Sequence, residues 1–164
     1  MQQLLVTRFI RESTSSYASP LVLIKKNGGS WRCCIDLKKL NAFTVKNKFP
    51  IPLIEDLLDE LNGACYFSKL DLRSGYKRVR MADEDIHKTT FQTHRGHFEW
   101  VVLPFGLCNA SATLQSLMND IFRSYLRKFI LVFFYNILVY TKTWNDLGGK
   151  WLGCQKTMER WHAL

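Results

Sequence analysis

Residues 129–140 read FILVFFYNILVY, two apolar runs that are separated by the pair Tyr135-Asn136. Both runs are rich in the β-branched and aromatic residues that strands favour. A two-residue connection has the length of a tight hairpin turn, and Asn accepts the positive φ that such a turn requires. The stretch therefore predicts an antiparallel hairpin with strands over Phe129–Phe134 and Ile137–Tyr140 and with Tyr135-Asn136 as its turn.

Patterns of helix and strand alternate along the rest of the chain. Apolar residues spaced three and four apart predict a helix from about Asn109 to Leu126. A second helix is expected to begin at Pro52 and to end at Asn62-Gly63, with one apolar face made by Leu53, Ile54, Leu57, Leu58 and Leu61. Strands are predicted over residues 21–24, 31–35, 65–72, 78–81, 89–93 and 97–103. This order indicates an α+β fold with a largely antiparallel sheet packed on helices.

The composition is that of one basic globular domain. The chain has 164 residues, of which 47% are hydrophobic, and its formal net charge is +9. The first fifty residues hold nine of the Lys and Arg residues and only two acidic residues. A basic excess concentrated in one segment favours an anionic partner, nucleic acid or a nucleotide. The alternative is a basic surface that serves only solubility.

No signal for a membrane or for secretion is present. No apolar run reaches the roughly 20 residues of a membrane span, and charged residues at Arg8, Arg11 and Glu12 interrupt the short apolar stretch at the N-terminus. The five cysteines show no C-x-x-C spacing, which argues against a disulfide framework or a zinc knuckle. We therefore expect an intracellular chain, in the cytoplasm or the nucleus, whose oligomeric state the sequence leaves open.

Several motifs follow one another in a family-specific order. They are Ser19-Pro20 through Lys26, Trp31-Arg32, Asp36, Leu40-Asn41, the run from Tyr66 to Tyr76, Leu103-Pro104-Phe105-Gly106-Leu107 and Gln115 to Asp120. Over about residues 4–145 they resemble the reverse transcriptase domain of a gypsy-like LTR retrotransposon Pol polyprotein. The resemblance implies the fingers and palm of a right-hand polymerase without a thumb. The fingers would be about residues 1–62 and 82–103, the palm about 63–81 and 104–144, and residues 145–164 a divergent tail.

The resemblance also implies roles for the residues that match the family. Asp71 would be a catalytic, metal-binding carboxylate, and Mg²⁺ would be the cofactor. Nucleotide-binding positions would be Lys26, Arg32, Leu72, Arg73, Tyr76, Phe105 and Gly106, the glycine because only it permits close backbone approach. The implied partners are a primer–template of RNA or DNA and a deoxynucleoside triphosphate. Without the family context, each side chain also has an ordinary interpretation as a turn cap, a core aromatic or a solvated charge.

The hairpin departs from the family at the positions that matter most for chemistry. Tyr135 and Asn136 stand where the family has two adjacent Asp residues that bind metal. A phenol with a pKa of about 10 is protonated at neutral pH, and an amide brings no charge to a cation that prefers carboxylates. We therefore predict that polymerisation is lost or reduced by several orders of magnitude. The alternatives are a non-catalytic nucleic-acid-binding module, a truncated retroelement remnant without selected function, or a surviving enzyme.

Smaller departures from the family accompany the change in the hairpin. Ser111 stands where Pro is usual and Cys108 where Thr is usual, while Lys77-Arg78 replace a His-Gln pair. After Trp144 the motifs no longer match. These differences are typical of a fragment of an eroded element.

Overall fold

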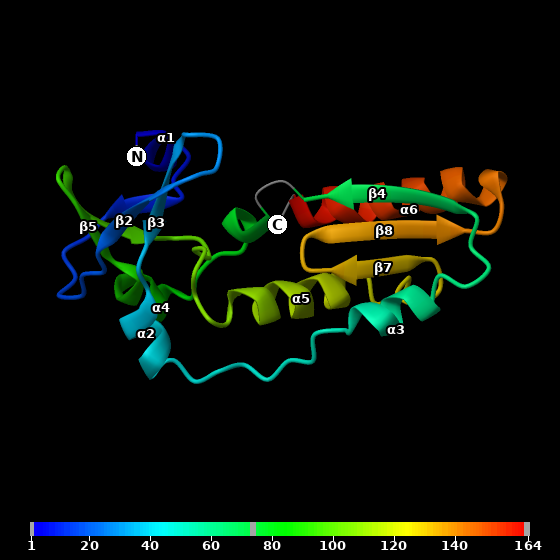
Figure 1. The fold of residues 1–164 in the computed structure, drawn as a ribbon, viewed down its shortest axis with the longest axis horizontal. Coiled ribbons are helices and arrows are strands. Elements are labelled where there is room, and N and C mark those ends of the chain that lie inside the picture. Colours follow the sequence, from blue (N-terminus) through cyan, green and yellow to red (C-terminus); the bar gives the residue numbers. More distant parts are fainter. Residues whose placement is uncertain (1, 73–74, 163–164) are drawn as a thin grey trace. The chain divides into compact units, whose positions relative to one another are not determined.

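The computed structural model describes residues 2–72 and 75–162, apart from the side chains of Arg32, Arg160 and His162. The described chain divides into two compact units, each made of two stretches of sequence (Figure 1). The first unit comprises Met1–Asn47 and Ser74–Ala110, and the second comprises Lys48–Arg73 and Ser111–Leu164.

The first unit contains two small antiparallel sheets. One has the order β1-β6-β5 and the other is the hairpin β2-β3. Its core is formed by Ile10, Phe91 and Phe98, with Leu21 and Trp100 among the residues packed against it. The elements are α1 (Gln2–Val6), β1 (Ile10–Glu12), β2 (Leu21–Lys25), β3 (Trp31–Ile35), α2 (Lys38–Phe43), α4 (Asp83–Ile86), β5 (Phe91–Thr93), β6 (Gly96–Trp100) and 3₁₀ helices at Gly75–Arg78 and His87–Thr89.

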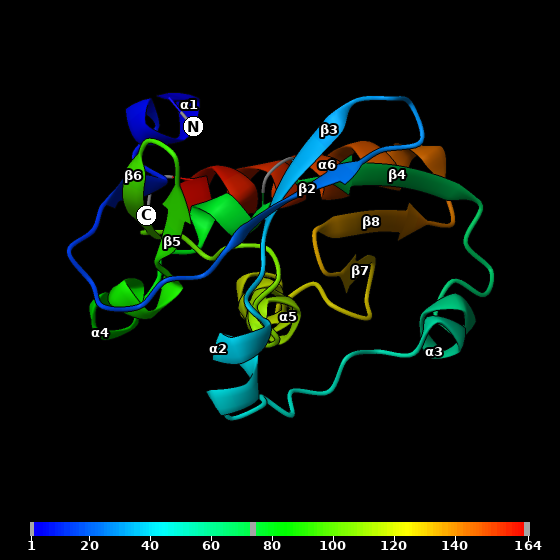
Figure 2. The same cartoon turned by 60° about the vertical axis from the view of Figure 1, so that its left-hand side comes forward.

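The second unit is one antiparallel sheet packed on helices. Its strands follow the order β4-β8-β7, so that β8 lies between the other two (Figures 1 and 2). The elements are α3 (Ile54–Asp59), β4 (Tyr66–Asp71), α5 (Ala110–Ile121), β7 (Ile130–Phe133), β8 (Asn136–Thr141) and α6 (Trp144–His162). The core consists of α5 and sheet side chains that are fully buried: Leu114, Met118, Phe122, Ile130, Ile137 and Val139.

The structure confirms the predicted α+β class, the antiparallel sheet and the strands at 21–24, 31–35 and 65–72 to within one or two residues. The predicted hairpin is present, but its turn begins one residue early. Phe133 pairs with Asn136, so the turn residues are Phe134 and Tyr135, and the positive φ of 53° belongs to Phe134. Asn136 is already the first residue of β8.

Three predicted elements differ from the observed ones. Residues 78–81 form no strand, because Arg78 ends a 3₁₀ helix and Arg80 makes only an isolated bridge with Val102. The long helix ends at Ile121 instead of Leu126, and the chain then turns, with Arg127 at a φ of 60°. The helix expected from Pro52 is limited to α3, and the apolar face predicted for it is largely exposed, at 64% for Leu53 and 60% for Leu58.

The tail folds as a long helix. Residues 144–162 form α6, which packs against β8 and β4 within the second unit. No helix in the described part of the chain is long and apolar enough to cross a membrane.

Candidate functional site

The structure brings Asp71, Tyr135 and Asn136 together at one end of the second unit's sheet. Asp71 is the last residue of β4 and lies directly opposite Asn136 of β8. The backbone N–H of Leu72 donates to the carbonyl oxygen of Tyr135 at 2.9 Å. Directly opposed residues of an antiparallel pair have Cβ atoms roughly 5 Å apart, so the Asp71 carboxylate neighbours the Asn136 amide. The three residues predicted as the catalytic group are therefore one cluster.

The donor atoms of this cluster do not match a site for two Mg²⁺ ions. They are one carboxylate, one neutral amide and one phenol, whereas hard divalent cations are held mainly by carboxylate oxygens. In residues 2–72 and 75–162, no group of three or more His, Cys, Asp or Glu side chains is placed to hold a metal ion. The Asp71 side chain is exposed, and Tyr135 is 38% exposed.

A buried glutamine of α5 fixes the hairpin backbone. Gln115 has no exposed surface. Its Oε1 accepts a hydrogen bond of 2.7 Å from the N–H of Phe134, and its Nε2 donates to the carbonyl oxygen of Val132 at 3.1 Å. These bonds hold the backbone on both sides of Phe133, directly before Phe134 with its positive φ, a conformation that a bulky side chain rarely adopts. Gln115 begins one of the family-like motifs but was not predicted as a site residue, although its spacing of three and seven from Met118 and Phe122 places it on the buried helix face.

Two of the predicted nucleotide-binding residues meet in the first unit. The rings of Tyr76 and Phe105 have centroids 4.6 Å apart and an interplanar angle of 56°. Tyr76 is buried, whereas Phe105 is 53% exposed. Gly106 follows with a φ of +99°, and an added Cβ would meet its nearest atoms only at 3.8 Å. Backbone conformation, and not the close approach of neighbouring atoms, is thus what requires glycine there.

Two asparagines, neither predicted as a site residue, hold the loop that carries Phe105 and Gly106. Asn41 Nδ2 donates to the Gly106 carbonyl at 2.7 Å, and its Oδ1 accepts from the Cys108 N–H at 2.8 Å. Asn109 Nδ2 donates to the carbonyl of Val45 at 2.9 Å. Asn41 stands in one of the family-like motifs, but its partners are more than sixty residues away in sequence, so spacing alone does not reveal them.

The other nucleotide-binding candidates do not share one element, because two belong to the β2–β3 hairpin and two follow β4 in sequence. Lys26 is exposed in the β2–β3 turn, where its N–H donates to Ser30 and its carbonyl accepts from Gly29. The backbone of Arg32 pairs with Ile24 in β3, but its side chain lies outside the described part. Arg73 also lies outside the described residues. In the second unit, Leu72 is buried.

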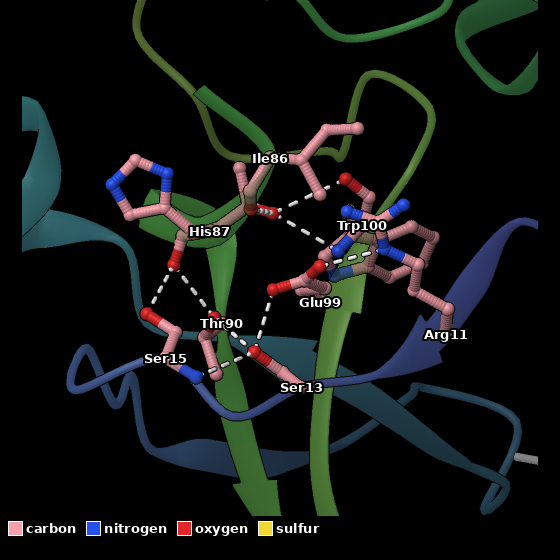
Figure 3. Close-up of polar contacts among 9 residues, drawn as sticks. Arg11, Ser13, Ser15, Ile86, His87, Thr90, Glu99 and Trp100 are labelled. Carbon is pink, nitrogen blue, oxygen red and sulfur yellow. Dashed lines mark hydrogen bonds and ion pairs between the residues drawn. The ribbon is translucent and has the colours of Figure 1, made fainter. Parts of the chain in front are cut away.

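A polar network fastens the N-terminal strand of the first unit to β6 (Figure 3). Glu99 is 6% exposed and accepts from Arg11 Nε at 2.7 Å and from Ser13 Oγ at 2.5 Å. Burial alone would raise the pKa of the Glu99 carboxyl, but the hydrogen bonds from Ser13 and Arg11 and the charge of Arg11 lower it overall. Glu99 therefore has a structural role in its ionised form.

Comparison with known proteins establishes the family. Residues 24–163 match the model of the family described as reverse transcriptase (RNA-dependent DNA polymerase). The chain is 50% identical over 118 residues to an RNA-directed DNA polymerase homolog of Oenothera berteroana, covering 72% of this chain and 83% of that protein. The chain therefore belongs to the reverse transcriptase family.

Within this family, the chain is similar to retrotransposon polyproteins. It is 38% identical over 151 residues to the retrovirus-related Pol polyprotein from transposon 297 of Drosophila melanogaster, covering 89% of this chain and 14% of that protein. It is 36% identical to the Tf2-7 polyprotein of Schizosaccharomyces pombe, of which it covers 11%. The chain thus spans a small part of these polyproteins and corresponds to their reverse transcriptase domain.

Solved structures confirm the fold. The foamy viral protease–reverse transcriptase in complex with an RNA/DNA hybrid superposes with a TM-score of 0.83 at 20% identity, covering 96% of this chain and 21% of that one. The foamy viral protease–reverse transcriptase dRH in complex with double-stranded DNA has a TM-score of 0.78 at 22% identity and covers 87% of this chain and 25% of that one. The fold is therefore the fingers and palm type of the reverse transcriptases.

Proposed function

We propose that this chain is a reverse-transcriptase-like domain of a gypsy-like element whose polymerase chemistry is lost or reduced by several orders of magnitude. The observation that carries the proposal is the register at the end of the sheet, where Asp71 lies opposite Asn136 and beside Tyr135. The resemblance implies carboxylates at all three positions. This chain has a carboxylate at only one of them.

Charge is the physical reason for the loss. In the two-metal scheme of phosphoryl transfer, the ions position the attacking and leaving oxygens and stabilise the charge that develops on them. Three carboxylates would offset most of the charge of two divalent cations, whereas a single carboxylate leaves it largely uncompensated. The phenol side chain of Tyr135 adds bulk but supplies no carboxylate ligand. We propose that the affinity for Mg²⁺ is correspondingly weak.

The remaining roles follow the resemblance. We propose that the fingers are about residues 1–62 and 82–103 and that the palm is about residues 63–81 and 104–144. Lys26, Arg32, Arg73 and the Leu72 backbone would lie near the triphosphate of a nucleotide. Tyr76 would lie under its sugar, and Phe105-Gly106 would approach the nucleotide and template.

A paired primer-extension experiment tests the catalytic proposal. The chain, its Asp71→Ala variant and the double variant Tyr135→Asp/Asn136→Asp are compared on one primer–template with MgCl₂. We expect no extension by the chain above the Asp71→Ala background and measurable extension by the double variant. Extension by the unchanged chain that exceeds the Asp71→Ala background would overturn the proposal.

A binding measurement complements the assay. Mn²⁺, a paramagnetic substitute for Mg²⁺, is titrated against the same three proteins while water proton relaxation is followed. The double variant should bind at least tenfold more tightly than the unchanged chain. Equal affinities would contradict the proposed charge deficit, whether or not any of the proteins extends a primer.

A second function is favoured by one surface feature of the first unit. Trp31 is 64% exposed and pairs with Lys25 in the β2–β3 hairpin, next to Lys26. An exposed aromatic ring beside cations suits stacking on bases and contacts with phosphates. Non-catalytic binding of nucleic acid is therefore the second candidate, and its test is the salt dependence of duplex binding.

A further inference from the structure

The loop that carries Phe105 and Gly106 exposes an aromatic ring of the first unit. Residues 104–109 belong to no helix or strand, and α5 begins directly after them at Ala110. The Phe105 ring is 53% exposed and lies against the buried ring of Tyr76, with centroids 4.6 Å apart. Irregular loops are more mobile than regular elements, so this ring keeps one position only if other parts of the fold hold the loop backbone.

Two asparagine side chains hold this backbone reciprocally. Asn41 of α2 donates from Nδ2 to the Gly106 carbonyl at 2.7 Å and accepts at Oδ1 from the Cys108 N–H at 2.8 Å. Asn109 of the loop makes one donated and one accepted bond with backbone groups of residues 45–47, each at 2.9 Å. We call these four hydrogen bonds the asparagine clamp. Each asparagine thus comes from one of the two segments and bonds the backbone of the other.

The asparagine clamp also fixes the loop relative to the end of β3. Helix α2 begins two residues after β3 ends. A Cβ built on Gly106 would have the Ile35 carbonyl oxygen and the Leu37 side chain as its nearest atoms, both at 3.8 Å. The clamp therefore holds the exposed Phe105 ring in a fixed relation to the base of the β2–β3 hairpin, within the same unit.

We propose that Asn41 and Asn109 are positioning residues for nucleic acid, because they hold the Phe105 ring where an unpaired base of a template overhang stacks on it. This inference rests on the proposed binding of nucleic acid by the first unit. Unpaired bases offer a free face to an aromatic side chain. A loop that is ordered before binding loses less conformational entropy on binding. Without the clamp, affinity would fall although the ring itself is unchanged.

A primer–template with a single-stranded overhang that contains 2-aminopurine tests the proposal. Fluorescence anisotropy of a label at the duplex end measures affinity, and the emission of 2-aminopurine reports stacking at saturating protein. Asn41→Ala, Asn109→Ala and Phe105→Ala should each weaken binding about fivefold or more, the lower end of what one stacked base contributes. All three should change the emission of the bound 2-aminopurine in the same direction.

Thr93→Ala is the matched control in the same unit. Thr93 Oγ1 also makes one donated and one accepted bond with backbone groups, those of Gly96 and Arg95 in the β5–β6 turn. Its replacement should leave both the affinity and the 2-aminopurine emission unchanged. Urea unfolding shows how far each change destabilises the protein. Equal losses of affinity in Thr93→Ala and Asn41→Ala would overturn the proposal, because they would reflect destabilisation alone.

The double variant Asn41→Ala/Phe105→Ala separates positioning from an independent effect on binding. Once the ring is absent, the change at Asn41 should have little further effect on affinity, because the two residues act through one contact. Fully additive effects would overturn the proposal, and so would an Asn41→Ala protein that binds like the unchanged chain. An unchanged chain that does not bind at all would overturn the proposed binding of nucleic acid together with this inference, so the two failures are distinguishable.

Discussion

At the scale of single residues, the shape of the β7–β8 hairpin and its chemistry are set by different side chains. Gln115 holds the hairpin through the backbone of Val132 and Phe134. Neither bond involves the side chains of Tyr135 or Asn136. The chain can therefore lose the two carboxylates expected at the tip and keep the hairpin, which is why an intact fold here carries no guarantee of catalysis.

Replacement of Gln115 should destabilise the protein. Gln115→Leu removes both hairpin bonds and leaves the Phe134 N–H without its partner, which costs about 1–3 kcal/mol. Urea unfolding measures the loss, and amide hydrogen exchange at Phe134 should accelerate beyond that of Leu131. The control is Gln155→Leu, because Gln155 is an exposed glutamine of α6. Equal losses of stability in the two variants would show that Gln115 does not hold the β7–β8 hairpin.

Restoring the carboxylates should also reduce stability when no divalent cation is present. Tyr135→Asp/Asn136→Asp places a like charge directly opposite Asp71 and another next to it, and such pairs destabilise an antiparallel sheet. We expect the free energy of unfolding to fall by about 1 kcal/mol at low salt, because each like-charge pair costs a few tenths to about 1 kcal/mol. Addition of MgCl₂ should restore the lost stability. Thermal melts with and without MgCl₂ measure both effects. The uncharged variant Tyr135→Asn provides the control. A melting temperature of the double variant that does not change on addition of MgCl₂ would contradict the prediction.

The same residues show what sequence can and cannot predict. The meeting of Asp71 with positions 135 and 136 was predicted from the resemblance to the family, whereas local patterns marked only the strand and the hairpin separately. The turn was misplaced by one residue because the positive φ of Phe134 is supported by Gln115, which lies on another element. The contacts of Asn41 are equally non-local. Amide side chains that bond distant backbone leave no periodic signal.

At the scale of elements, periodicity predicted which segments are helical better than which faces are buried. The apolar residues of α3 do have helical spacing, yet Leu53, Ile54 and Leu58 are each more than half exposed. The stripe on α5 is buried as expected, since Leu114, Met118 and Phe122 have no exposed surface. Spacing reports the local conformation, whereas burial depends on what the rest of the chain places against the face.

The attachment of β1 to β6 should depend on pH through Glu99. The pKa of Glu99 is lowered in the folded state, so the unfolded chain binds more protons at this site and stability rises with pH. The stability that ionised Glu99 contributes is complete above the ordinary glutamate pKa of about 4.3. It is lost as the pH falls through the lower pKa that Glu99 has in the folded protein. Glu99→Gln should therefore reduce stability at pH 7 by about 1–3 kcal/mol, the scale of hydrogen bonds to charged groups.

Denaturant titrations at several pH values between 3 and 7 measure this effect. Glu99→Gln should flatten the acid limb of the stability curve relative to the unchanged protein. Glu12→Gln is the matched control, because Glu12 is an exposed residue of β1. A curve for Glu99→Gln that runs parallel to that of the unchanged chain would exclude the proposed linkage.

At the scale of the whole molecule, the uneven distribution of charge is the property that most directly concerns partners. The two units differ in what they expose: the first presents a basic hairpin with an exposed indole, and the second presents a cluster with a single carboxylate. The proposed binding of nucleic acid and the proposed loss of catalysis therefore depend on different units and can be tested separately. A chain without polymerase activity could retain the first.

Duplex binding by the β2–β3 hairpin should fall steeply with salt. Each phosphate that a lysine neutralises contributes about 0.9 to the slope of log affinity against log salt, so Lys25→Gln/Lys26→Gln should lower the slope by up to about 2 and weaken binding at low salt. Lys142→Gln/Lys156→Gln removes the same charge from exposed positions in the second unit and should leave the slope nearly unchanged. Anisotropy titrations with a labelled primer–template at several KCl concentrations measure both. Equal slopes for the two double variants would mean that net charge alone attracts the duplex, and the hairpin would then have no special role in binding.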